Sequence, residues 1–494
     1  MAESNRLEHP GVDKAAGEEF LREALQVLLD EAVRKGTDVT EKVCDWKEPG
    51  ELRELLDLEL RSDGEPPERL LGRCRDVIRY SVRTGHPRFF NQLFSGLDHH
   101  ALAGRLITEA LNTSQYTYEI APVFVLMEEV VLAKLRELVG WSCGDGIFTP
   151  GGSISNMYAV NVARFHRFPE SRRKGSWALP RLALFTSREP LLHPERSCFP
   201  GHWHRQRPPG RHRRAGEDDP RGAGEERSRG QKLRALSLFL SVPPAAPPSW
   251  APSTRWAASP TSASATASGS TWMQPGAAAP CSPPNTGTSW PVSRGEADSV
   301  AWNPHKMLTV GLQCSAFLLR DTSGLLQRCH GAGATYLFQP DKFYDVAYDT
   351  GDKTPQCGRR VDCLKLWLLW KAAGTEGLAR RVERAFAFTR YLAEEVKRRD
   401  GFQLVLEPEF INLCFWFVPP SLRGREGAPD YWPRLGKVAP AIKERMMRKG
   451  SMMVGYQPHG AKVNFFRQIV TNPAVTRDDL DFFLDEIERL GQDL

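Results

Sequence analysis

Hydrophobic and polar positions follow a helical period over the first third of the chain. From Glu18 to about Val139, apolar residues recur every three or four positions, and two of these segments end in glycine after a basic turn, which predicts a series of helices. The next stretch, "GIFTPGGSISNMYAVNVARF", predicts a short strand, a glycine turn and a helix. A second strand follows at "RLALFTS", as expected for an α/β sheet.

The pattern breaks in the middle of the chain. Seventeen of the 37 prolines fall between Pro190 and Pro291, and no acidic residue occurs between Glu226 and Glu296. Neither period persists there, so the composition predicts disorder. Residues 187–295 also hold fourteen Lys and Arg against seven Asp and Glu, and this tract accounts for the net charge of +6. Because the excess of positive charge is confined to this tract, we expect no nucleic-acid partner.

Ordered patterning resumes after the tract. Two strand-like runs are followed by helical segments at Val361–Ala373 and Gly377–Lys397, and strands and helices then alternate to the end, which predicts a smaller α+β C-terminal domain. The chain is thus predicted to consist of an N-terminal helical segment (residues 1–95), a large domain (96–375) and a small C-terminal domain (376–494). The large domain contains the aberrant tract, residues 190–295.

Composition adds three expectations. Hydrophobic residues make up 41% and charged residues 26% of the chain, which is typical of globular proteins. No signal peptide or long apolar run is present, so we expect a cytoplasmic protein without a membrane partner. His202, His204 and His212 could suggest a metal, but they have no carboxylate or cysteine support, and we expect no metal site.

Two motifs could bind a cofactor. Lys306 lies in "WNPHK", where a desolvated lysine could form a Schiff base with a carbonyl group; the alternative is an ordinary solvated lysine. "GGSISN" places Gly151, Gly152 and Ser153 at a helix start, which suits a phosphate, and the alternative there is an ordinary N-cap at Ser153.

Two further residues could bind an acidic substrate. Arg467 is a charge within the apolar run "VNFFRQIV", where it could hold a carboxylate or form a structural ion pair. Gln92, in "FFNQLFSG", is an amide between apolar neighbours, and its alternative is a buried, hydrogen-bonded core group.

Taken together, these motifs resemble one enzyme family. The segments "GHPRFFNQLFSGLD", "LNTSQYTYEIAPVFVLME", "PGGSISNMYAVNVAR", "DSVAWNPHKML", "YDTGDKTPQCGRRVDCLKLWLLWK" and "GSMMVGYQPHG" are similar to the group II pyridoxal-phosphate decarboxylases. The resemblance covers about residues 25–187 and 296–494. It implies an α/β fold of the fold-type I pyridoxal-phosphate-dependent transferase kind, with a mostly parallel central sheet. It also implies pyridoxal 5'-phosphate as cofactor and a homodimer with active sites at the interface.

The resemblance also implies roles for cofactor-binding residues. Lys306 would carry the cofactor as a Schiff base, Gly152 and Ser153 would lie in the phosphate-binding turn, and His305 would lie nearby. Cys357 matches a residue that approaches the phosphate bound by the partner subunit.

The remaining matches concern the substrate. Gln92 and Arg467 match positions that hold its carboxylate, and Tyr336, in "GATYLFQPDKFYD", matches a mobile-loop tyrosine that protonates the carbanion. Phe94 stands where glutamate decarboxylases carry a smaller polar residue. The expected reaction is the decarboxylation of L-cysteine sulfinate to hypotaurine, a step of taurine biosynthesis. Glutamate or aspartate decarboxylation, or a catalytically dead dimerisation partner, are the alternatives.

Two family motifs are missing from the tract. These are a histidine that stacks on the cofactor ring and an aspartate, in an Asp-Ala-Ala-Trp-Gly segment, that pairs with the pyridine nitrogen. Yet the genetic code forces an Asp-Ala pair when Trp272–Gln274 are read from the third base of the preceding codon. We therefore hypothesise that residues 190–295 are a mistranslated exon and that the chain as printed is impaired. The alternative is a genuine disordered insertion.

Overall fold

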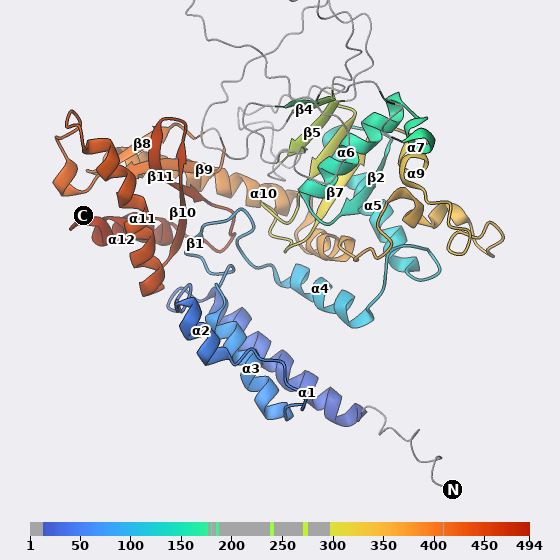
Figure 1. Cartoon of the computed structure of the whole chain (residues 1–494), viewed down its shortest axis with the longest axis horizontal. Helices are drawn as coiled ribbons and strands as arrows, with labels where there is room; N and C mark the ends of the chain where they lie inside the picture. The colour runs from blue at the N-terminus through green and yellow to red at the C-terminus, as the bar shows by residue number, and fades with distance from the viewer. Residues whose placement is uncertain are drawn as a thin grey trace, which may run out of the picture. The chain divides into compact units, whose positions relative to one another are not determined.

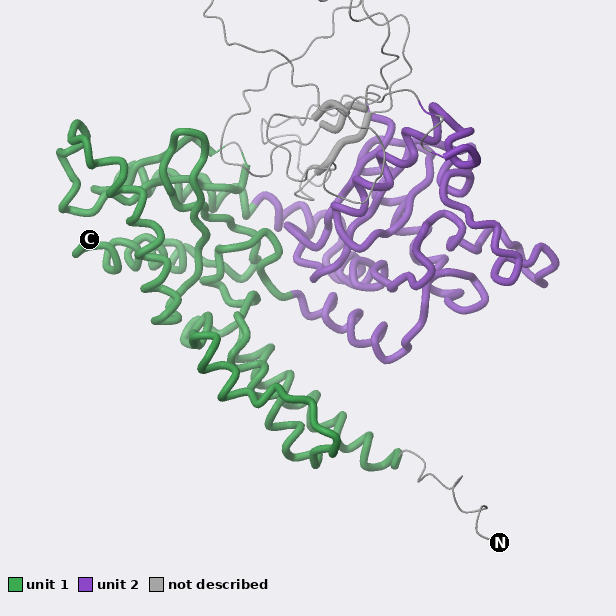
Figure 2. The backbone as a smooth tube through the Cα atoms, in the orientation of Figure 1, with its two compact units in different colours: residues 1–97, 384–494 green, residues 98–383 purple. Residues whose placement is uncertain are grey.

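The computed structural model describes residues 13–175, 179, 184–186, 238–241, 270–274, 297–408 and 410–494. They belong to two compact units, coloured separately in Figure 2: unit 1 comprises residues 1–97 and 384–494, and unit 2 comprises residues 98–383. Unit 1 contains both the N-terminal and the C-terminal segment, which the sequence predicts as separate parts. The predicted domain boundaries stay a prediction. None of the described helices combines the length and the apolarity that a membrane span needs.

The N-terminal part of unit 1 is helical, as the hydrophobic period predicts (Figure 1). Its first helix begins at Asp13, whose carboxylate accepts a hydrogen bond from the Ala16 amide at 3.1 Å and so caps the helix. The helical elements are α1 (Lys14–Val27), the π-helical η2 (Leu28–Arg34), the 3-10 helix η3 (Lys35–Thr37), α2 (Pro49–Leu56) and α3 (Pro67–Tyr80).

The C-terminal part of unit 1 is built on a five-stranded sheet in the order β1-β10-β11-β9-β8. The strands are β1 (Phe89–Phe90), β8 (Phe402–Leu406), β9 (Asn412–Phe417), β10 (Met453–His459) and β11 (Lys462–Ile469). β1 pairs parallel to β10, and the other pairs are antiparallel. The helices α11 (Tyr431–Lys449) and α12 (Arg477–Gly491) pack on this sheet.

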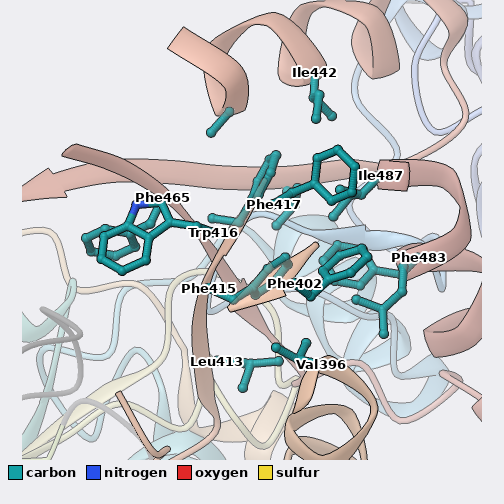
Figure 3. Packing of buried hydrophobic residues seen from close by; sticks show 14 of the residues in the cluster. Val396, Phe402, Leu413, Phe415, Trp416, Phe417, Ile442, Phe465, Phe483 and Ile487 are labelled. Atoms are coloured by element: carbon teal, nitrogen blue, oxygen red, sulfur yellow. The ribbon is translucent and has the colours of Figure 1, made fainter. Parts of the chain in front are cut away.

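Aromatic rings fill the core of this sheet and its helices, as Figure 3 shows. The Phe415 ring contacts the rings of Phe402 and Phe483, with centroids 5.8 and 6.0 Å apart. Their burial removes a large apolar area from water, which is the main stabilising term for such a unit.

Unit 2 contains a six-stranded sheet in the order β2-β7-β6-β5-β4-β3. The strands are β2 (Asp145–Thr149), β3 (Leu184–Thr186), β4 (Leu238–Ser241), β5 (Ser270–Gln274), β6 (Ser299–Trp302) and β7 (Ser315–Leu319). β7 is antiparallel to both of its neighbours, and the remaining pairs are parallel. The expected α/β fold is thus confirmed, with a mixed sheet in which three of the five strand pairs are parallel. β4 and β5 lie inside the tract 190–295; the rest of that tract lies outside the described residues, so its predicted disorder stays a prediction.

Helices cover both faces of this sheet. Ile147 of β2 packs in one cluster with Phe317 of β7 and Tyr158 of α6 (Gly152–Arg167). The next position, Gly146, faces the other way, because a Cβ there would lie 3.4 Å from Leu132 of α5 (Pro122–Val139). The other helical elements are α4 (His99–Leu111), α7 (Ser171–Lys174), α9 (Leu325–His330), η9 (Val346–Tyr348), η10 (Thr350–Lys353) and α10 (Cys363–Arg398).

The long helix α10 is interrupted at Gly374, which has φ 66° and ψ 172°. This left-handed φ favours glycine and ends the helical hydrogen bonding locally. The interruption lies between the two helical segments that the sequence predicts.

A buried ion pair fastens α5 to the segment before α10. Arg359 and Glu128 are 4% and 2% exposed, and Nη2 of Arg359 donates to Oε1 of Glu128. The carboxylate also accepts from the Phe148 amide and from Nε2 of Gln115, both at 2.9 Å. Both charged groups of this network are therefore paired. Removing either one leaves the other buried without a partner.

Replacing Arg359 by Met is expected to lower the free energy of unfolding by about 3–5 kcal/mol, because the Glu128 carboxylate would stay buried without its cation. Urea unfolding followed by circular dichroism measures the loss. The matched control is Arg360→Met, which breaks the exposed ion pair with Glu109 and is expected to cost about 1 kcal/mol or less. Equal losses in the two variants would contradict the assignment.

Candidate active site

Two loops of unit 2 meet at one edge of its sheet. β2 pairs with β7 from Thr149 opposite Ser315, and β6 pairs with the same strand with Trp302 opposite Ala316. Since β2 and β6 both run antiparallel to β7, their carboxyl ends lie at the same edge, flanking the start of β7. Ser155 ties this edge together: its Oγ lies 2.6 Å from Oγ1 of Thr149 and 3.0 Å from Oγ of Ser315. Ligands of α/β sheets bind outside the carboxyl ends of strands.

The loop after β2 forms a glycine turn that starts α6. Gly151 is the N-cap residue with φ 113°, and the helix begins at Gly152. Ser153 is exposed within the first turn, so the alternative interpretation of Ser153 as an ordinary N-cap is wrong. The first amides of a helix have no partner within it, and together with the helix dipole they favour a phosphate.

The loop after β6 brings a second polar group to this turn. Asn303 is fully buried, and neither amide atom of its side chain has a hydrogen-bond partner among the described residues. A Cβ at Gly152 would lie 2.9 Å from Nδ2 of Asn303, so only glycine allows the two loops this close an approach. A buried amide with unused hydrogen bonds, beside a helix start, fits an anionic ligand. Sequence reasoning missed Asn303, although it stands in the same "WNPHK" motif as Lys306.

His305 and Lys306 follow in the same turn. The Lys306 amide donates to the Asn303 carbonyl at 3.0 Å, and the lysine residue is half-buried rather than fully solvated. Nδ1 of His305 lies 2.5 Å from the carbonyl oxygen of Cys314, and burial lowers the pKa of His305 to about 4. The imidazole is therefore neutral near pH 7. A primary amine and a turn suited to a phosphate thus belong to loops at one sheet edge, an arrangement that fits pyridoxal phosphate.

Tyr336 and Cys357 also belong to unit 2. Tyr336 is 75% exposed, and Cys357 is exposed. Exposure suits a residue expected to move over a substrate and one expected to reach a partner subunit. The proton transfer by Tyr336 and the phosphate contact by Cys357 stay predictions.

Unit 1 holds the three residues expected to select the substrate. Arg467 lies on β11 opposite Gly455 of β10, and its Nε and Nη2 are buried without a hydrogen-bond partner among the described residues. Burial lowers the pKa of the guanidinium, which remains charged because its reference value is so high. No carboxylate bonds to these two atoms in the described part of the chain, and this geometry favours the ligand interpretation of Arg467 over a structural ion pair.

The loop that carries Gln92 and Phe94 lies beside the same part of the sheet. A Cβ at Gly455 would lie 3.5 Å from Oδ1 of Asn91, and this oxygen accepts a hydrogen bond from Nζ of Lys443 at 2.9 Å. Gln92 itself is exposed, so the alternative interpretation of it as a buried core group is wrong. Phe94 is half-buried.

The expectation that the chain has no metal site concerns residues inside and outside the described part of the chain. The described residues contain no group of three His, Cys, Asp or Glu side chains that could hold a metal ion. His202, His204 and His212 lie outside the described residues.

Comparison with known proteins identifies relatives over the whole chain. A family model described as "Pyridoxal-dependent decarboxylase conserved domain" matches residues 49–191 and 287–418. The chain is 57% identical to the cysteine sulfinic acid decarboxylases of Rattus norvegicus and Homo sapiens, with all of both chains covered. It is 51% identical to the acidic amino acid decarboxylase GADL1 of Bos taurus, with 99% of this chain and 94% of that protein covered.

Solved structures agree with this assignment. The crystal structure of mouse CSAD matches with a TM-score of 0.83 and 52% identity, covering 98% of this chain and all of that one. A second crystal structure, that of Oryza sativa TDC with PLP and tryptamine, shares the fold at a TM-score of 0.71 and 17% identity, covering 98% of this chain and 99% of that one. The family resemblance and the cofactor expected from the sequence are thereby confirmed, and the chain belongs to the pyridoxal-dependent decarboxylases.

Proposed function

We propose that this gene encodes an enzyme that decarboxylates L-cysteine sulfinate to hypotaurine, a step of taurine biosynthesis. The observation that carries the proposal is the buried edge of the Arg467 guanidinium, which has no hydrogen-bond partner among the described residues, in a chain 57% identical to cysteine sulfinic acid decarboxylases. A guanidinium in this state binds a carboxylate or a sulfinate through paired, charge-assisted hydrogen bonds. The runner-up substrates are glutamate and aspartate, which the similarity to an acidic amino acid decarboxylase supports.

The residues of the site divide the chemical work. Bound pyridoxal phosphate supplies a ring that absorbs the electron pair left by the departing CO2. Lys306 would hold the cofactor by its amine, while the start of α6 and the Asn303 amide would hold the phosphate. Gln92 and Arg467 orient the acidic groups of the substrate. Tyr336 delivers the proton that completes the product.

Phe94 is the residue we assign to substrate choice. Phe94 is half-buried and lies two residues after Gln92, and we infer that its large apolar ring disfavours the longer side chain of glutamate. Comparing kcat/KM for cysteine sulfinate, aspartate and glutamate tests the proposal. Preferred use of glutamate would refute the first choice and support the runner-up.

Arg467→Met is expected to raise KM for cysteine sulfinate by about 100-fold or more, because a charge-assisted pair contributes roughly 3 kcal/mol. Arg467→Lys keeps the charge but loses the paired geometry, and it should recover only part of the affinity. Steady-state kinetics measure both. An unchanged KM in the Met variant would show that Arg467 does not bind the substrate.

We also propose that the protein acts as a cytoplasmic homodimer. Large apolar side chains lie exposed on the helices of both units, and a second copy of the chain would cover them: Leu21, Leu25, Leu70, Val77, Ile107, Val123 and Val130. Sedimentation equilibrium measures the subunit number, and a monomer at micromolar concentration would contradict the proposal.

The present chain is proposed to be impaired in the middle of the large domain. The family model leaves residues 192–286 unmatched, which coincides with the tract 190–295. The codons of Trp272–Gln274 that conceal the Asp-Ala pair belong to β5, and Gln274 pairs with Trp302 at the edge where Lys306 lies. An aspartate in this segment would stand on the strand next to the one that leads to Lys306, which supports its proposed role in pairing the ring nitrogen. Resequencing the transcript tests this, and an unbroken reading of the present tract would refute it.

A catalytically dead partner remains the second candidate for the present chain. Its support is the intact helical part of unit 1, which could still join an active subunit. Co-purification with an active decarboxylase, without activity of its own, would identify this role.

A further inference from the structure

The segment from Gly331 to Asp349 carries Tyr336 and is mostly open to solvent. Tyr336 is 75% exposed and Phe343 is 95% exposed. Exposed side chains contribute little packing, so a few contacts define the path of the segment: ring packing, such as Phe338 on Tyr116 with centroids 5.3 Å apart, and the polar contacts of Lys342. The most buried ion pair of this segment within the described residues joins Lys342 to Asp349, whose side chains are 9% and 2% exposed.

Lys342 connects the turn that bears Tyr336 to the body of unit 2. Its Nζ donates to the carbonyl oxygen of Leu337 at 2.9 Å and to Oδ2 of Asp349 at 2.8 Å. Leu337 directly follows Tyr336, and the Tyr336 carbonyl accepts from Nε2 of Gln339 at 2.8 Å. The last carbonyls of this short turn are therefore satisfied by side chains that follow it, as in a helix C-cap.

Asp349 forms the fixed end of this connection. Its Oδ1 accepts from the Tyr118 amide at 2.9 Å and from the Tyr344 hydroxyl at 2.9 Å, so that with Lys342 the carboxylate has three donors. The Tyr118 ring packs against those of Tyr344 and Tyr348, with centroids 5.2 and 5.5 Å apart. A carboxylate held by backbone, hydroxyl and ammonium groups is a rigid anchor.

We propose that Lys342 and Asp349 are positioning residues for Tyr336. They would restrict the movement of the exposed turn, so that the phenol reaches the reacting carbon from a defined direction. The inference rests on the proposed function, in which Tyr336 delivers the proton. Positional errors of about 1 Å can cost a reaction step about 100-fold, which gives such an anchor a catalytic consequence without any contact with the substrate.

Chymotryptic cleavage of the full-length chain, mapped by mass spectrometry, tests the anchor. Lys342→Met and Asp349→Asn are expected to accelerate cleavage after residues 336–338 by about tenfold, because the turn would open more often. Lys342→Arg should stay within about twofold of the wild type, since it can donate to both oxygens. The control is Lys353→Met, which breaks a partly buried pair with Asp145 outside this segment and should leave these cleavages unchanged.

Steady-state kinetics add the functional test. In a chain whose residues 190–295 carry the alternative-frame reading, Lys342→Met is expected to lose about tenfold in kcat with an unchanged KM, because the residues proposed to bind substrate lie on other elements. Wild-type cleavage in Lys342→Met, or equal acceleration in Lys353→Met, would overturn the inference. The cleavage assay needs no turnover, so it decides the question for an inactive chain as well. Full activity of Tyr336→Phe would instead refute the proposed proton donor and leave the cleavage result standing.

Discussion

A chain in which residues 190–295 carry the alternative-frame reading is expected to decarboxylate L-cysteine sulfinate at least about 10³-fold faster than the present chain. The restored aspartate would pair with the pyridine nitrogen and keep it protonated, and a protonated ring accepts the electron pair far better than a neutral one. The restored histidine would stack on the ring. Turnover and the visible absorption of the bound cofactor measure the difference.

The matched control is the restored chain with its strand aspartate replaced by asparagine. This variant keeps the shape and the surrounding tract but cannot hold the proton on the ring, so it should bind cofactor and lose most of the turnover. It separates the electronic role of the aspartate from the folding of the tract. A normal cofactor band and full turnover in the present chain would contradict both the impairment and the frame hypothesis.

Replacing Lys306 by Ala in the restored chain is expected to lower kcat by about 10³-fold or more, because the cofactor loses its covalent attachment and the site loses its amine. The absorption band of the Schiff base should disappear, while the phosphate turn, which does not involve this side chain, should still bind pyridoxal phosphate weakly. Borohydride reduction followed by peptide mapping gives an independent measurement. In the unsubstituted chain it should label Lys306.

The control for this substitution is Lys371→Ala. Lys371 lies on α10, where its ammonium is 5.3 Å from the centre of the Trp367 ring, and it has no expected role in catalysis. It should leave turnover and cofactor absorption unchanged. Labelling of a lysine other than residue 306 would contradict the assignment.

Much of the cofactor site could be predicted from sequence because its parts are continuous motifs. The strand, glycine turn and helix around Gly152 appear in order along the chain, and Lys306 follows a buried strand. Asn303 cannot be singled out from sequence because an asparagine is ordinary in a loop, and only the structure shows that its amide is buried with no partner in the described part of the chain. The N-cap is Gly151 and not Ser153 because the backbone angles decide where the helix begins. The residue types along the chain constrain these angles only loosely.

Other features depend on tertiary pairing. β4 and β5 have no clear alternation of apolar and polar residues, and their strand conformation is defined by ladders with their neighbours rather than by local propensity. The link from Lys342 to Leu337 and Asp349 joins residues whose charges, read along the chain, indicate only a solvated loop.

The antiparallel strand β7 has a consequence for how an enzyme of this kind loses its activity through mutation. It is bonded on one side to the strand that leads to the phosphate turn and on the other to the strand that leads to the lysine. About 150 residues separate these halves along the chain, yet no hydrogen bond of the two ladders depends on the intervening tract. A frame error confined to that tract can therefore abolish catalysis while the strands that lead to the phosphate turn and to the lysine stay paired. A gene that loses its function in stages would encode such a chain.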